Sequence, residues 1–281
     1  MPTPGPESST ERAREHGFTL IEILVAILLL AVVSQGFVSF FTTSSRMRTI
    51  ADVRLETHQA VTATMDTLAR DVRLAGICFP SNGQFVSLGG ANNGAQDQIT
   101  IRLGNTTNQS CVQSALAAGA DAAAGGNTLT LDSAQGFTVG TTGYVTNGSN
   151  GDFFKITSVA GTVITTDATW SRLYPAASSS VYAMQEHVYR VNTAIDPRGP
   201  VLTSQRDRGT EEVFADGITG LNVQYRKIDN SVVDLPASDA EWRLVNAVLL
   251  SVTAQSLTTL PGGGFHQETA SFTVKPRNLQ P

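Results

Sequence analysis

The sequence has few cysteines, few aromatic residues and few charged residues, and each shortage excludes a class of protein. Its 281 residues include 2 cysteines, too few for a disulfide-rich scaffold or for a four-cysteine zinc or iron–sulfur site within one chain. Aromatic residues make up 7%, so stacking platforms for bases or sugars are not a feature of the chain. The net charge of −5 argues against a dedicated nucleic-acid-binding protein, because such a protein needs a basic face.

Signatures of catalytic sites are missing as well. The histidines His16, His58, His187 and His266 do not have the spacing of metal ligands, and the sequence has no nucleophile elbow, P-loop or dinucleotide-binding glycine motif. Residues 147–152, NGSNGD, carry oxygen atoms of the kind that calcium binds, but a polar hairpin turn explains the same residues. The sequence therefore predicts a protein that is not an enzyme and has no cofactor and no metal site, with calcium at 147–152 as the open alternative.

Apolar residues are concentrated in one stretch near the N-terminus. Residues 18–41 contain a single charged residue, Glu22, and residues 23–33 are apolar without interruption. That length is enough for a helix of about 20 residues that crosses a bilayer core, and no second stretch approaches it. A carboxylate within hydrocarbon costs roughly 2.5–3.5 kcal/mol, so Glu22 is expected to have a function. The alternative is that its side chain snorkels to the edge of the bilayer.

The residues around this stretch do not match an ordinary secretory signal or a plain anchor. Residues 1–17 are polar and carry charges of both signs, whereas a secretory signal begins with a basic region. The segment AVVSQGF at 31–37 offers only a poor cleavage site of small residues. A different kind of targeting segment is therefore indicated.

The segment at residues 17–26 reads GFTLIEILVA and resembles the class III signal of type IV prepilins and type II secretion pseudopilins. The resemblance implies that a membrane-bound prepilin peptidase cleaves after Gly17 and N-methylates Phe18. It also implies that Glu22, fifth in the mature chain, pairs with the terminus of a neighbouring subunit and sets the axial register. The leader at 1–17 departs from the pattern because it is slightly acidic rather than basic.

Three further segments carry a narrower resemblance to PilW-type minor pilins. Residues 66–76, DTLARDVRLAG, are similar to the end of the long helix in that family, residues 214–225, FADGITGLNVQY, to one of its strands, and residues 245–252 to the next strand. The resemblance implies a minor type IV pilin, a structural subunit that helps to initiate or cap pilus filaments. A minor pseudopilin of the J class and the adhesin head of a pilus tip are the alternatives.

The same resemblance implies partners and a location. The partners are other minor and major pilins, the prepilin peptidase, the pilus assembly platform of the inner membrane, and the membrane itself; no nucleic acid is inferred. The location is the bacterial inner membrane, crossed once, with the head in the periplasm and with incorporation into the pilus at the cell surface.

The helical pattern continues past the apolar stretch. Apolar residues between 50 and 75 recur at steps of three and four, which is typical of an amphipathic helix lying on a globular domain. Gly36 is where this long helix is most able to bend, and Gly76 is placed to end it. Six charged residues fall largely on the other faces of the helix: Arg54, Glu56, Asp66, Arg70, Asp71 and Arg73.

The sequence therefore predicts an α+β fold in which a long N-terminal helix, membrane-spanning in its first half, packs on a β-rich head like that of type IV pilins. The predicted divisions are a cleaved leader at 1–17, a transmembrane helix at 18–41, its amphipathic continuation at 42–77 and the periplasmic head at 78–281. Residues 114–127, rich in alanine and glycine, are expected to form an exposed loop, with a short, marginal helix as the alternative. The expected strands are 98–103, 128–132, 153–159, 162–167, 187–192, 220–227, 245–256 and 269–275.

The two cysteines, Cys78 and Cys111, fall in the part of the chain expected outside the cytoplasm, where thiols oxidise. We expect a disulfide that ties the end of the helix to the chain after the strand at 98–103. Two buried free thiols are the alternative. A catalytic cysteine is not expected, because no histidine is suitably placed.

Overall fold

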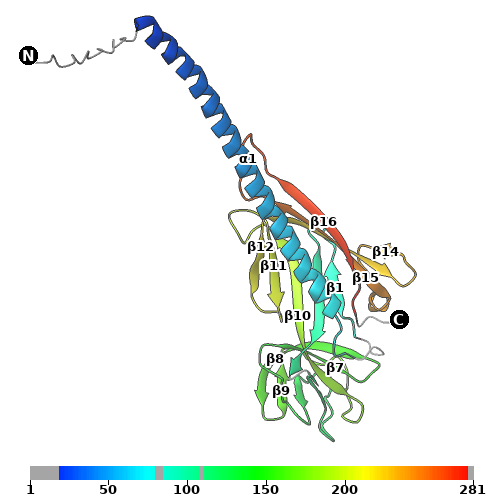
Figure 1. The fold of residues 1–281 in the computed structure, drawn as a ribbon. Coiled ribbons are helices and arrows are strands. Elements are labelled where there is room, and N and C mark those ends of the chain that lie inside the picture. The colour runs from blue at the N-terminus through cyan, green and yellow to red at the C-terminus, as the bar shows by residue number, and fades with distance from the viewer. Residues whose placement is uncertain (1–18, 80–84, 108–109, 278–281) are drawn as a thin grey trace, which may run out of the picture. The chain divides into compact units, whose positions relative to one another are not determined.

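The computed structural model describes residues 19–79, 85–107 and 110–277 (Figure 1). The predicted leader at 1–17 and Phe18 lie outside the described residues. The described chain divides into two compact units, one ending at Ala51 and the other beginning at Asp52.

One helix, α1 (Leu20–Leu74), accounts for both predicted helical segments. Gly36 lies within it and does not interrupt it. Every residue from 19 to 43 is exposed, so this part of α1 makes no core of its own. Together with the β-rich head described next, α1 confirms the predicted α+β fold, while the boundaries of the leader and of the membrane span stay predictions.

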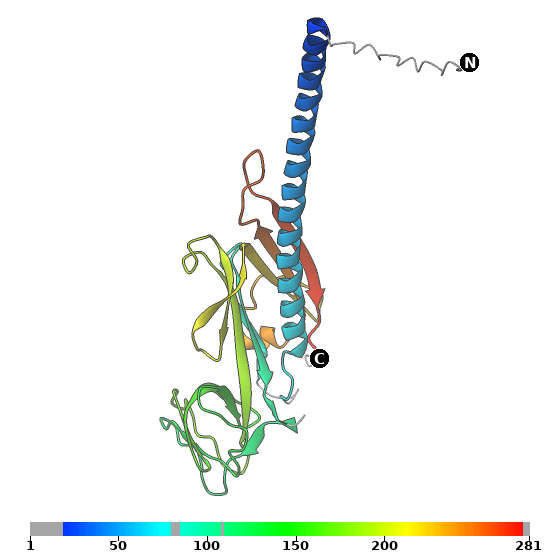
Figure 2. The same ribbon diagram turned by 60° about the vertical axis from the view of Figure 1, so that its left-hand side comes forward.

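The largest sheet of the head has ten strands, and its longest, β10, connects two regions (Figure 2). The first part of β10 pairs with β5 and β7, and its second part pairs with β2 and β11, all antiparallel. The path of the sheet is β1-β2-β10-β7-β8-β9-β6, with β5, β11 and β12 off it. Its strands are β1 (Leu88–Ala91), β2 (Gln98–Gly104), β5 (Gln113–Ala115), β6 (Thr128–Thr130), β7 (Thr142–Thr146), β8 (Gly151–Ala160), β9 (Val163–Thr166), β10 (Ser180–Asn192), β11 (Val201–Arg206) and β12 (Glu211–Asp216).

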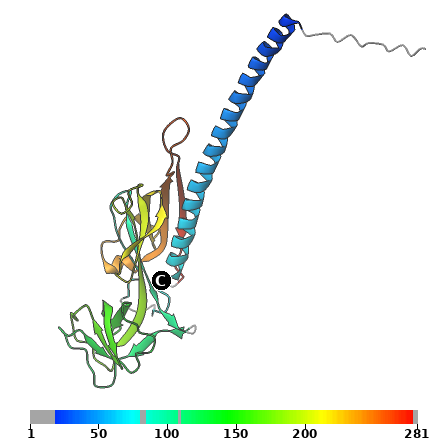
Figure 3. The ribbon, with the colours of Figure 1, turned by 90° about the vertical axis from the view of Figure 1, so that its left-hand side faces the viewer.

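A second sheet has four strands in the order β14-β13-β15-β16 (Figure 3). Its strands are β13 (Ile218–Lys227), β14 (Val232–Val233), β15 (Val245–Gln255) and β16 (Gln267–Val274). The remaining elements are the short helix α2 (Asp239–Trp242) and a two-stranded ribbon of β3 (Thr106–Thr107) and β4 (Ser110–Cys111).

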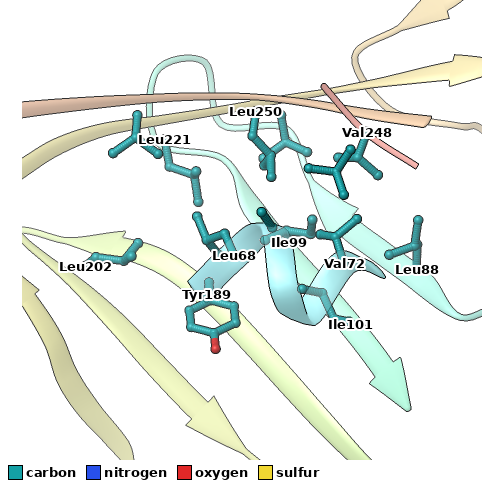
Figure 4. Packing of buried hydrophobic residues seen from close by; sticks show 14 of the residues in the cluster. Leu68, Val72, Leu88, Ile99, Ile101, Tyr189, Leu202, Leu221, Val248 and Leu250 are labelled. Carbon is teal, nitrogen blue, oxygen red and sulfur yellow. The ribbon is translucent and has the colours of Figure 1, made fainter. Parts of the chain in front are cut away.

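The main core lies where α1 is covered by both sheets. Figure 4 shows Leu68 and Val72 of α1 between Leu250 of the four-stranded sheet and Leu202 of the ten-stranded sheet. None of these four side chains is more than 1% exposed. Burying one such side chain stabilises a fold by roughly 1.5–3 kcal/mol, so this contact fixes the end of α1 in the head.

A second core fills the region formed by β5 to β9 and the first part of β10. It contains Trp170 and Tyr174, and it includes part of the segment 114–127. The prediction of an exposed loop holds for most of this segment, but Leu116 and Ala122 are only 2% and 4% exposed. The alanine-rich chain follows the edge of this core, where small side chains fit.

All eight expected strands are present, and their ends shift by a few residues, except that β10 begins at Ser180, seven residues before the expected start at 187. The segment 214–225 is not one strand, however. It breaks at Gly217, whose φ of 71° is a conformation that favours glycine, and a Cβ there would lie 2.5 Å from the carbonyl oxygen of Gln255. Consequently β12 ends in one sheet and β13 begins in the other.

Candidate functional site

The start of α1 is closed by a reciprocal pair of hydrogen bonds between Thr19 and Glu22. The backbone N–H of Thr19 donates to Glu22 Oε2 at 3.4 Å, and the backbone N–H of Glu22 donates to Thr19 Oγ1 at 3.4 Å. This is the geometry of a capping box, which satisfies N–H groups that the first turn of a helix leaves unpaired. This role of Thr19 was not predicted from the sequence, although the spacing T-x-x-E signals it.

Glu22 has no cation near it along its own helix. The next basic residue along the described part of α1 is Arg46, roughly 36 Å further on at 1.5 Å per residue. Among the described helices, α1 is the one long and apolar enough to cross a membrane. No cation of the described helix therefore lies close enough to pair with the Glu22 carboxylate. Gly17 and Phe18, which flank the expected cleavage point, lie outside the described residues.

The other end of α1 is tied to β2 and to the β3–β4 ribbon. The N–H of Gly76 donates to the carbonyl of Arg102, and the N–H of Gly104 donates to the carbonyl of Ile77, both at 2.9 Å. Next to these bonds the sulfurs of Cys78 and Cys111 are joined, with Cα atoms 5.4 Å apart. A Cβ on Gly104 would lie 2.5 Å from Cys78 Cβ, so only glycine allows this approach.

A buried polar cluster holds α1 against β10. Oδ2 of Asp71 accepts hydrogen bonds from His187 Nδ1 at 2.8 Å and from the Tyr189 hydroxyl at 2.7 Å. Asp71 is only 4% exposed, so the expectation that it lies on an outer face of the helix was wrong. Helical periodicity cannot reveal this, because the two partners come from a strand more than a hundred residues away.

The hydrogen bonds of this cluster decide the ionisation of Asp71. Burial disfavours the charged carboxylate, but the hydrogen bonds from His187 and Tyr189 outweigh it and lower the pKa of Asp71 below its usual range. Burial, together with the Asp71 carboxylate, raises the pKa of the Tyr189 hydroxyl. The tyrosine therefore stays protonated as a donor, and the cluster joins α1 to β10.

The start of α1 and the residues before it match a known sequence motif. Residues 12–34 match the prokaryotic N-terminal methylation motif, and the match includes Gly17, Phe18 and Glu22. The start of the chain is therefore similar to that of type IV pilin-like proteins. This confirms the predicted resemblance at the level of the superfamily, whereas the PilW-type assignment stays a prediction.

Part of the chain is also similar to a curated protein that is described as pilin-like. The chain is 30% identical over 95 residues to the pilin-like protein PilA3 of Thermus thermophilus. The matched region is 31% of this chain and 41% of that protein, so the chain spans about two fifths of the length of the relative. No solved structure matches the chain significantly.

Within the head, the segment 147–152 forms a polar turn. The side-chain oxygen of Asn147 accepts hydrogen bonds from the N–H groups of Ser149 and Asn150, at 3.1 and 2.9 Å, which closes an Asx turn. Across the described ranges, no group of three or more His, Cys, Asp or Glu side chains is gathered as a metal would require. The turn thus has the local hydrogen bonds expected of a hairpin.

We expect Cys78 and Cys111 to be linked in the protein isolated from cells. Replacing both with serine should lower the free energy of unfolding by roughly 3–4 kcal/mol. The reason is that the bridge joins residues 33 positions apart and so restricts the conformations of the unfolded chain. Peptide mapping without reductant checks the link, and denaturant unfolding of the full chain in detergent checks the energy. Free thiols in freshly isolated protein would contradict the expectation.

Proposed function

We propose that the chain is a minor type IV pilin, a structural subunit that helps to initiate or cap pilus filaments. The observation that carries this proposal is the methylation motif at the start of a single helix that ends inside a head with two cores. In the shaft of a filament, heads are packed densely around the helices. A head of this size fits better at a filament end, where a subunit present in few copies has room.

The proposed processing step creates the charge that Glu22 needs. Hydrolysis of the bond between Gly17 and Phe18 frees an amine one residue before the capping threonine, Thr19. The N-terminus of a helix is already electropositive, so an added cation there is stabilised by a carboxylate. Glu22 supplies one in the first turn, and in a bundle of helices the amine of a neighbouring subunit can approach it.

The motif and the apolar helix indicate that the chain is anchored in a membrane. We further propose a single pass through the inner membrane, with the head in the periplasm before assembly. The proposed partners are other minor and major pilins, the prepilin peptidase and the assembly platform of the inner membrane. None of these roles requires catalysis by this chain.

One experiment tests the processing and the assembly together. Filaments sheared from cells and the remaining membranes are each analysed by mass spectrometry for the N-terminal peptide of this chain. We expect N-methylated Phe18 as the first residue in both fractions. Gly17→Leu should leave the precursor in the membrane, because a side chain before the cut obstructs the peptidase, whereas Thr19→Ser should be processed normally.

Two results would contradict the proposal. A mature chain beginning near Gln35 would make the protein an ordinary secreted one. A correctly processed chain that is absent from filaments and is needed for protein secretion would instead identify a secretion pseudopilin.

A further inference from the structure

Strand β16 forms one margin of the four-stranded sheet (Figures 1 and 2). It pairs with β15 over eight consecutive residue pairs, from Val248 with Val274 to Gln255 with Gln267, without an irregularity. Beyond β16 the sheet has no further strand among the described residues. The margin is therefore a straight edge eight residues long.

Two hydrogen bonds show which backbone groups of β16 point outward. The N–H of Ser256 donates to the carbonyl of His266 on the β16 side, and the N–H of Gln255 donates to the carbonyl of Gly217 on the β13 side. In antiparallel pairs, hydrogen-bonded and non-hydrogen-bonded residues alternate. Every second residue of β16 therefore bonds to β15, and the intervening ones direct their N–H and C=O groups to the outer edge. The outward residues are Gln267, Thr269, Ser271 and Thr273.

These outward groups are unpaired and accessible. Within the described ranges, no backbone hydrogen bond joins the outer edge of β16 to another segment. All four residues that carry the outward groups are exposed. Their side chains share one face with β15, where Thr269 bonds to Thr253 and Ser271 to Ser251, each at 2.9 Å.

The outer edge of β12, the other long margin of the head, is protected against pairing with another chain, whereas the outer edge of β16 is not. Natural edge strands carry lysine, proline, bulges or charges that prevent pairing with another chain. β16 has one charged residue, Glu268, and its carboxylate turns inward to His58 of α1 at 2.6 Å. By contrast, β12 carries Glu211, Glu212 and Asp216 and meets β11 across a shifted register. The margins β14 and β6 are only two and three residues long.

We propose that the outer edge of β16 accepts an extended strand from the head of a neighbouring subunit. A row of backbone donors and acceptors at the spacing of a strand is matched by another extended backbone, and not by a lipid or a saccharide. The incoming strand should be uncharged, with small polar residues beside Thr269 and Ser271 and apolar residues on the side of Ala270 and Phe272. That the partner is a fellow subunit rests on the proposed function.

Photo-crosslinking of the full chain in cells tests this edge. A photoreactive amino acid replaces Gln267 at the margin or, as the control, Asn222, which is exposed on the same face of the sheet but lies in the inner strand β13. We expect an adduct with another pilin-like subunit from position 267 and none from position 222. Equal adducts from the two positions would overturn the proposal, because they would report random contact.

A pair of variants at Ser271 shows whether the backbone edge is responsible. Ser271→Pro removes an outward N–H and the hydroxyl that bonds to Ser251, but no backbone bond to β15, whereas Ser271→Ala removes only the hydroxyl. The first should reduce the adduct from position 267 about tenfold, and the second should leave it unchanged. If the proline variant unfolds, as judged by thermal unfolding in detergent, Thr269→Lys places a charge at the same edge and should give the same loss.

The outcome can be separated from that of the proposed function. A chain that is processed after Gly17 and recovered in filaments, yet gives no adduct from position 267, would overturn the role of β16 and leave the proposed function standing. An adduct that is lost with Ser271→Pro, in a chain that never enters filaments, would support the role of β16 and contradict the proposed function.

Discussion

Glu22→Val is expected to insert into the membrane and to be processed after Gly17, but to abolish the assembly of this chain with partner pilins. Glu22 is the single charged residue of the apolar segment, and the amine of Phe18 is the cation that processing creates. An amine left without its carboxylate in an apolar bundle is an unmatched buried charge, which costs about 3–5 kcal/mol. Pull-down with partner pilins and counts of filaments per cell measure the loss.

Because Glu22 belongs to the capping box at the start of α1, Glu22→Gln is a control that separates the loss of the charge from the loss of the cap. Glutamine can replace glutamate in a capping box, so this variant keeps the hydrogen bond from the Thr19 N–H and loses only the charge. If the ion pair is what matters, Glu22→Gln should fail to assemble as Glu22→Val does. If capping is what matters, glutamine should restore assembly. Normal filament numbers with Glu22→Val as the sole copy would refute both roles and leave the snorkelling alternative.

Asp71→Ala should destabilise the head by about 3 kcal/mol, the largest effect expected of a single substitution outside the apolar cores. Without the carboxylate, the His187 ring and the Tyr189 hydroxyl stay buried and lose their shared acceptor. Denaturant unfolding of the full chain in detergent measures the change. Asp66→Ala, at an exposed position of the same helix, should change stability by less than about 0.5 kcal/mol. Equal effects of the two substitutions would contradict a special role for the cluster.

The stabilisation by Asp71 should also depend on pH in a defined direction. Its pKa in the folded protein is lower than the value of about 3.9 expected in the unfolded chain. The ionised carboxylate therefore stabilises the fold above about pH 4, and this contribution is lost as the pH falls through the folded-state pKa. Asp71→Asn lacks the titrating group, so its stability deficit relative to the parent protein should shrink between pH 7 and pH 3. A constant deficit would show that folding does not shift the pKa of Asp71.

The long helix and its two environments were predictable because their signals are local. An apolar run of the length of a membrane span, followed by apolar residues at steps of three and four, indicates a helix whatever lies around it. Strands such as β2 and β13 were predictable for the same reason, since runs of β-branched residues between turn clusters suffice. The methylation motif is also a short contiguous segment, which is why the family could be inferred from residues 17–26.

The residues that join distant segments could not be predicted in this way. Asp71 resembles the other charged residues of its helix, and only the approach of β10 shows that it is buried. Gly217 looks like part of one strand, but the packing of its backbone against Gln255 divides that segment between two sheets. Thr19 is a different case, because its capping role was readable from the spacing to Glu22.

The sequence by itself determined the helix, half of the described strands, the methylation motif and the pair of cysteines, because each depends on composition or on spacing along the chain. Only the tertiary structure decided which strands lie at the margins of the sheets and which polar groups are buried. Pairing between strands is set by contacts between residues far apart in sequence, and a strand at an edge has the same local pattern as one inside a sheet. For that reason the open edge of β16 became visible only when the register of β13, β15 and β16 was known.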